Sequence, residues 1–191
     1  MSIFKAENLA QADHRAAMQQ PRHSVLVVDD VRANASVMAA ILRPHFNLLE
    51  AHDGEQALAL IDALPATEPL ACVISDYRMP RMSGVQLFEA LRKISPHTRR
   101  VMVTGYMDMD ALVDAINRAE IYRFVAKPFD ATDFLLTVRC AVAAFETVQA
   151  QEALEQASAD IIDSARAALR AARQEQLAQE ALLRARLTAA G

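Results

Sequence analysis

Short apolar runs alternate with helical segments along residues 24–128, and this alternation is the strongest constraint on the fold. Each run is four to six residues long and is followed by a polar residue, as expected for strands buried on both faces of a parallel sheet. The expected strands are 24–28, 46–51, 70–75, 100–103 and 122–126. Apolar residues at helical spacing predict helices at 31–43, 55–64, 85–94 and 108–118, and a fifth from 130 onward. This order predicts an α/β fold, a doubly wound five-stranded parallel sheet with right-handed crossovers.

The C-terminal part of the chain has a different composition. From Asp130 to Ala190 there is no glycine or proline, and beyond Cys140 about a third of the residues are alanine, the best helix former. The last helix could therefore run for about 60 residues, or roughly 90 Å at 1.5 Å per residue, which is far more than a sheet needs as cover. We expect a flexible N-terminal arm at 1–22, an α/β domain at 23–145 and an extended C-terminal α-helix at 146–191.

Composition excludes several other classes of protein. The net charge of −4 gives the chain no overall attraction to nucleic acid. No apolar run approaches the roughly 20 residues that span a bilayer, and the N-terminus has no signal-peptide pattern. Cys72 and Cys140 are too far apart in sequence to suggest a disulfide framework or a metal site. We therefore expect a soluble, cytoplasmic protein with no membrane insertion.

Polar residues follow four of the expected strands. They are Asp29 with Asp30, then Asp76, Thr104 and Lys127. Because the carboxyl ends of parallel strands meet at one edge of a sheet, these side chains should converge there. Three close carboxylates repel one another unless a cation joins them, and hard oxygen ligands suit Mg²⁺. A lysine and a hydroxyl beside them would hold phosphoryl oxygens.

The residues at these strand ends resemble the receiver domain of bacterial two-component response regulators. The resemblance covers residues 24 to about 145. Its motifs, in chain order, are Val25–Asp30, Asp76 with Met79-Pro80 and Gly84, Val101–Gly105, and Phe124–Pro128. Each motif is short, but together and in order they are specific. The resemblance implies a flavodoxin-like receiver fold with the strand order 2-1-3-4-5.

The resemblance also implies a phosphoacceptor. Asp76 would attack the phosphohistidine of a sensor histidine kinase. Asp29, Asp30 and Asp76 would bind Mg²⁺, and the backbone carbonyl of Arg78 would complete the protein ligands. The protein would then be a signalling phosphoprotein rather than an enzyme, although it would assist its own Mg²⁺-dependent phosphotransfer and dephosphorylation.

Thr104 and Lys127 would bind the phosphoryl group, and the resemblance implies a cis Lys127-Pro128 bond. Thr104 and Phe124 would form the conformational switch. Many receivers have tyrosine where this chain has Phe124, which has no hydroxyl to donate. An aromatic ring at this position can still move toward Thr104 upon phosphorylation.

The tail allows three interpretations: a solvated helix, a coiled coil, or a helix that docks on a partner. All five histidines precede residue 98, so the tail is not a histidine phosphotransfer module. Acids outnumber bases there and aromatic residues are lacking, which argues against DNA binding. Large apolar residues recur at spacings near seven, at Leu154, Ile161, Ile162, Leu169, Leu177, Leu182, Leu183 and Leu187. We expect a homodimer through this helix, with antiparallel pairing because the first half is acidic and the second basic, or docking on a downstream protein target.

The favoured function is therefore a response regulator that signals through a phosphorylation-dependent conformational change, with output by dimerisation or protein partners. A first alternative is a receiver-like adaptor that works without phosphorylation. A second is the N-terminal part of a longer regulator with a separate output domain. The segment Ala115–Phe124 resembles receivers that precede hydrogenase-type transcriptional regulators or cyclic-di-GMP phosphodiesterases. The sequence does not identify the kinase, the signal or the target.

Overall fold

The computed structural model describes residues 23–65, 67–105 and 119–189. The expected N-terminal arm at 1–22 and the expected helix at 108–118 lie outside the described residues. The expected ends of the other elements differ from the observed ends by two residues or fewer.

The strands form one parallel sheet. In spatial order they are β2 (Asn47–Ala51), β1 (Ser24–Val28), β3 (Leu70–Asp76), β4 (Arg99–Thr104) and β5 (Arg123–Ala126). Every neighbouring pair is parallel. The predicted five-stranded sheet and the strand order implied by the resemblance are both confirmed.

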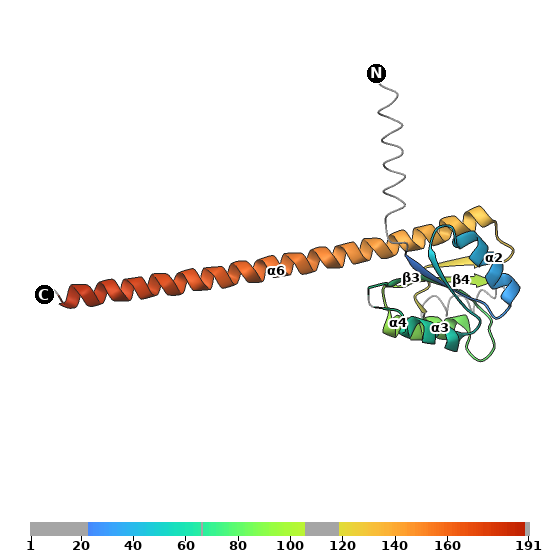
Figure 1. Cartoon of the computed structure of the whole chain (residues 1–191), viewed down its shortest axis with the longest axis horizontal. Helices are drawn as coiled ribbons and strands as arrows, with labels where there is room; N and C mark the ends of the chain where they lie inside the picture. Colours follow the sequence, from blue (N-terminus) through green and yellow to red (C-terminus); the bar gives the residue numbers. More distant parts are fainter. Residues whose placement is uncertain (1–22, 66, 106–118, 190–191) are drawn as a thin grey trace, which may run out of the picture. The chain divides into compact units, whose positions relative to one another are not determined.

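Helices cover both faces of this sheet (Figure 1). One face packs against α2 (Arg32–Leu42) and the first turns of α6 (Ala131–Ala189), and the other against α3 (Gly54–Asp62) and α4 (Gly84–Ile94). Alternate residues of β1 supply the two cores, which is why the strand is a continuous apolar run. Val25 and Val27 belong to the first core and Leu26 and Val28 to the second, and all four are fully buried.

Aspartates mark the starts of α3 and α6. Asp53 accepts a hydrogen bond from the backbone N–H of Gln56 at 2.8 Å. Asp130 accepts from the backbone N–H groups of Thr132 at 2.7 Å and Asp133 at 3.1 Å. These bonds satisfy N–H groups that have no partner within the helix. They also hold the pKa of each aspartate below its usual value.

Helix α6 contributes to two compact units, residues 1–146 and residues 147–191. In the first unit it buries one apolar side on the sheet, through Phe134, Val138, Ala141, Val142 and Phe145. In the second, every described side chain from Gln149 to Ala178 is exposed. Among the described residues, no helix combines the length and the apolar character needed to cross a bilayer.

Candidate functional site

The carboxyl ends of four strands lie level at one edge of the sheet. Val28 pairs with Ser75, and Thr104 pairs with Ala126, so the residues that follow these strands start from the same edge. The loops after β1 and β5 then bring side chains from distant parts of the sequence to the end of β3. The residues brought into contact are Asp29, Asp76 and Lys127.

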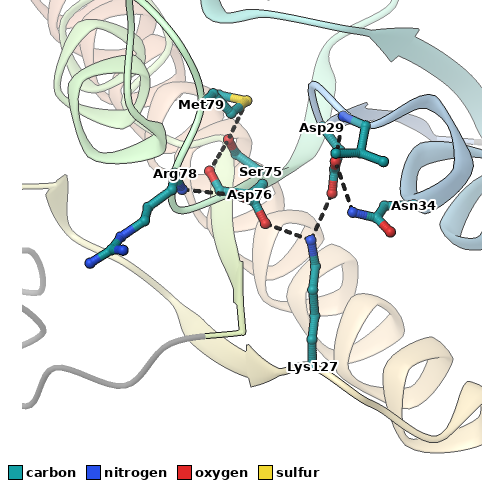
Figure 2. A network of polar contacts seen from close by, with 8 residues as sticks. Asp29, Asn34, Ser75, Asp76, Arg78, Met79 and Lys127 are labelled. Carbon is teal, nitrogen blue, oxygen red and sulfur yellow. Dashed lines mark hydrogen bonds and ion pairs between the residues drawn. The ribbon is translucent and has the colours of Figure 1, made fainter.

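Lys127 joins the two carboxylates (Figure 2). Its Nζ donates to Oδ2 of Asp29 at 2.8 Å and to Oδ1 of Asp76 at 2.5 Å. The Asp29 side chain is 0% exposed, whereas 13% of Asp76 and 23% of Lys127 are exposed. A buried carboxylate needs a charged partner, and Lys127 provides it for Asp29. Burial alone lowers the pKa of Lys127, but its hydrogen bonds to Asp29 and Asp76 and their charges outweigh burial, so this pKa lies above its usual value.

The remaining carboxylate oxygens are held by groups close in sequence. Oδ1 of Asp29 accepts from the backbone N–H of Val31 at 2.9 Å and from Nδ2 of Asn34 at 3.2 Å. Oδ2 of Asp76 accepts from the backbone N–H of Arg78 at 2.8 Å. Both carboxylates are therefore oriented before any ligand arrives, which lowers the cost of positioning them for chemistry.

Sequence reasoning missed Asn34 and Arg81. Asn34 is a polar residue on α2, and only its contact with Asp29 reveals a role at this edge. Arg81 lies in the loop after Asp76 and donates to Oδ2 of Asp53 at 2.6 Å, which ties this loop to the turn before α3. No local motif predicts either contact, because each joins residues from different loops or elements.

Three other predicted residues lie at or near this edge, in different environments. Asp30 is exposed, unlike the preceding Asp29. Thr104 is 4% exposed, and its backbone carbonyl accepts from the backbone N–H of Lys127 at 2.8 Å. Phe124 is half-buried and pairs with Met102, two residues before Thr104, so Phe124 and Thr104 share one face of the sheet.

The donor set suits a hard cation such as Mg²⁺, because two aspartate carboxylates already converge on one positive charge. Within the described part of the chain, no three His, Cys, Asp or Glu side chains are gathered as metal ligands. The ligand set of Asp29, Asp30, Asp76 and the Arg78 carbonyl therefore stays a prediction. The expected cis Lys127-Pro128 bond is confirmed.

A groove of about 440 Å³ adjoins the site, with walls from α2 and the loop between β5 and α6. Its lining residues are Asn34, Val37, Met38, Lys127, Pro128 and Phe129. A larger hollow of about 560 Å³ lies at the opposite edge of the sheet, where Ser24 and Asn47 begin the first two strands. We call Asp29, Asp76 and Lys127 the acid–lysine cluster. Of these two hollows, the smaller groove includes a residue of this cluster, Lys127, and the larger one does not.

The fold agrees with comparisons to known proteins. The response regulator receiver domain family matches residues 25–139, and the chain belongs to this family. The hydrogenase transcriptional regulatory protein HoxA of Cupriavidus necator is 30% identical over 127 residues, which are 66% of this chain and 26% of HoxA. The transcriptional regulatory protein CpxR of Escherichia coli K12 is 30% identical over 119 residues, covering 61% of this chain and 48% of CpxR.

Solved structures show the same relationship. The signal receiver domain of an HD domain-containing protein from Pseudomonas fluorescens Pf-5 has a TM-score of 0.61 and 31% identity, covering 66% of this chain and 98% of that one. NtrX from Brucella abortus has a TM-score of 0.62 and 28% identity, covering 69% of this chain and 29% of that one. The chain spans about a quarter of the length of the first curated relatives, HoxA and DctD. The shared part is the receiver domain.

Proposed function

We propose that this receiver accepts a phosphoryl group on Asp76 from a sensor histidine kinase. The observation that carries the proposal is the position of the Asp76 carboxylate. It ends β3 at the edge of the sheet, is partly exposed, and is held by Lys127 and by the backbone N–H of Arg78. The protein acts as a phosphoacceptor, and its own residues assist the transfer.

In the proposed step, a carboxylate oxygen of Asp76 forms a bond to phosphorus as the phosphorus–nitrogen bond of the kinase phosphohistidine breaks. The leaving imidazole keeps the electron pair of that bond and takes up a proton. Lys127, with its raised pKa, remains an ammonium at neutral pH and offsets charge on the phosphoryl oxygens. The hydroxyl of Thr104, beside Lys127 at the same edge, would donate to another of these oxygens.

Mg²⁺ would be held by Asp29, Asp30, Asp76 and the backbone carbonyl of Arg78. When bound, it supplies positive charge that neutralises the phosphoryl oxygens and the carboxylates. Asp29 and Asp76 share a cation already, which supports a site for a divalent ion there. Asp30 is exposed and so accessible to an ion that keeps part of its water shell.

Signalling would follow from a change in Thr104 and Phe124. The phosphoryl group would draw the Thr104 hydroxyl toward Asp76, and the Phe124 ring would move into the space this leaves. The two residues lie on adjacent strands and on one face of the sheet, which supports this coupling. The ring also packs against the core that includes Met102 and Leu87. Because Leu87 belongs to α4, movement of the ring would displace this helix.

The groove beside Lys127 is the proposed approach for the kinase. Val37, 56% exposed, and Phe129 give the groove an apolar wall next to the acid–lysine cluster. A partner seated there could present its phosphohistidine to Asp76.

We place the protein in the cytoplasm. The two cysteines are unpaired thiols, which suits the reducing conditions of that compartment.

Mass spectrometry after incubation with acetyl phosphate and Mg²⁺ tests the proposal. One phosphoryl adduct is expected in the unmodified chain and none in Asp76→Asn. Asp62→Asn is the matched control, because Asp62 is an exposed acid at the end of α3 and should leave the adduct unchanged. An adduct that persists in Asp76→Asn would overturn the assignment.

Of the two other functions, this experiment distinguishes only the first. A receiver-like adaptor would form no adduct even in the unmodified chain with Mg²⁺. A longer regulator would form the adduct and would pass the signal to a further output domain. HoxA and CpxR, of which this chain matches only a part, are named as transcriptional regulatory proteins.

A further inference from the structure

We propose that the tail helix, residues 147–189 of α6, pairs antiparallel with the same segment of a second copy of this chain. The inference does not depend on phosphorylation of Asp76. It starts from exposed apolar side chains in the compact unit formed by residues 147–191. Leu154 is 68% exposed, Ile161 70% and Leu169 72%. A solvated helix gains little from propensity alone, and most helical stability in proteins comes from packing such a face.

These side chains lie on a face with no charged residue over five turns. Steps of three and four residues from Leu154 follow one side of the helix. The residues met on this side are Leu154, Ala157, Ser158, Ile161, Ala165, Ala168, Leu169 and Ala172. Alanine and serine between the large residues would let a second helix approach closely. The face is therefore shaped for another helix.

Charge identifies the second helix as a copy of the first. Residues 147–164 contain four acids and no base, whereas residues 165–189 contain five arginines and two glutamates. If two copies of the helix paired in parallel, the acidic half of one copy would lie against the acidic half of the other. In antiparallel pairing, each acidic half lies along the basic half of the second copy.

The helix dipole does not explain this charge distribution. Its effect falls off within the first and last turn of a helix. Asp160, Asp163, Arg166 and Arg170 lie in the middle of the tail, many turns from either end of α6. Asp163 and Arg166 also pair within one helix at 3.5 Å, but both are well exposed, and such a pair contributes little stability.

A two-fold axis near Ala165 gives a specific arrangement. It sets Ile161 of one copy level with Leu169 of the other. Glu155 and Arg173 are 18 residues apart, about five turns at 3.6 residues per turn, so they lie on the same side of the helix. Antiparallel two-fold pairing brings equivalent sides together, and Glu155 of one copy then comes within reach of Arg173 of the other, twice per dimer.

The first test is the mass of the full, unphosphorylated chain at tens of micromolar, measured by light scattering. We expect a dimer, and a monomer would overturn the proposal. The double variant Ile161→Asp with Leu169→Asp should weaken association by about tenfold or more, the equivalent of 1.4 kcal/mol. Ala167→Asp is the matched control, because it adds the same acid on the opposite side of the helix. An equal loss of association in this control would show that the face is not the interface.

The second test determines direction. Glu155→Arg and Arg173→Glu should each weaken association severalfold, and the two together should restore it because the pair is only exchanged. Glu152→Arg makes the same charge change away from the face and should have a much smaller effect. A spin label at Gln151→Cys, in a Cys140→Ser background, should give a distance of about 40 Å between copies for antiparallel pairing about Ala165. A distance of about 20 Å or less would indicate parallel helices and overturn the arrangement.

Discussion

Gly84 leaves room for the main chain of Asp76: a Cβ atom at residue 84 would lie 2.2 Å from the carbonyl oxygen of Asp76. The start of α4 and the end of β3 are therefore in direct backbone contact. Because both partners are main chain, no side-chain rotation can relieve such a clash.

We predict that Gly84→Ala lowers the free energy of unfolding by about 1–3 kcal/mol, the usual cost of overpacking, and slows phosphorylation by displacing the end of β3. Gly105→Ala is the control for stability, because its Cβ would lie 3.9 Å from Cβ of Lys127, an ordinary contact. Urea denaturation of both variants checks the prediction. Equal stability of Gly84→Ala and the unmodified chain would contradict it.

Replacing Lys127 should destabilise the fold in a pH-dependent way. Lys127→Met leaves the buried Asp29 carboxylate without its cationic partner, and we expect a loss of about 1–3 kcal/mol at pH 7 in EDTA. The pKa of Lys127 is raised in the folded state, so its contribution is complete below the unfolded-state pKa of about 10.4 and is lost as pH rises through the folded-state pKa.

Urea denaturation between pH 7 and pH 11 tests whether the pKa of Lys127 is raised in the folded state. The stability difference between the unmodified chain and Lys127→Met should stay constant up to about pH 10 and shrink above it. A difference that already shrinks between pH 7 and pH 9 would mean that the pKa of Lys127 is lowered instead.

Removing Asp30 should weaken the proposed Mg²⁺ site. The variant Asp30→Ala loses a carboxylate ligand, and we expect at least about tenfold weaker Mg²⁺ binding and slower phosphorylation by acetyl phosphate. Calorimetric titration with Mg²⁺ provides a measurement independent of phosphorylation. Asp62→Ala removes an acid at the other edge of the sheet and should bind Mg²⁺ normally. Equal affinity in the two variants would remove Asp30 from the ligand set.

We predict that Arg100 stabilises the fold mainly through its hydrogen bonds to backbone carbonyls rather than through its ion pair with Glu120. Its side chain is 4% exposed and donates to the carbonyls of Pro96 at 3.3 Å and Glu120 at 3.2 Å. The Glu120 carboxylate, also at 3.2 Å, is 57% exposed. Arg100→Met should cost about 1–3 kcal/mol, because two carbonyls lose their donor.

Glu120→Gln provides the comparison, because it removes only the charge of an exposed partner and should cost less than about 1 kcal/mol. Thermal unfolding of both variants measures the difference. A larger loss in Glu120→Gln than in Arg100→Met would show that the ion pair dominates.

Much of the fold could be predicted because strands and helices leave different periodic patterns in the sequence. The continuous apolar run of β1 indicated burial on both faces, and it was followed by Asp29, a site residue. The same pattern could not predict that the Asp29 side chain is buried and the Asp30 side chain exposed. Their burial differs because successive side chains point in different directions once the strand has ended. That distinction requires the loop geometry.

Other parts of the site depend on contacts between distant segments. Lys127 is 98 residues from Asp29, and only the register of the sheet brings them together. Family resemblance suggested this approach, whereas apolar periodicity alone did not. Arg100 could not be predicted as buried, because a charged residue near the start of a strand ordinarily indicates an exposed edge.

The part of α6 that covers the sheet has a consequence for biosynthesis. Phe134, Val138, Val142 and Phe145 complete the core that contains Val25, yet they are made after every strand of the sheet. When β5 of a nascent chain has just left the ribosome, the face of the sheet that α6 later covers is therefore still exposed to solvent and to chaperones. The match to the receiver family ends at residue 139, before Val142 and Phe145. A fragment cut there would carry every strand and still lack the last side chains that close its core.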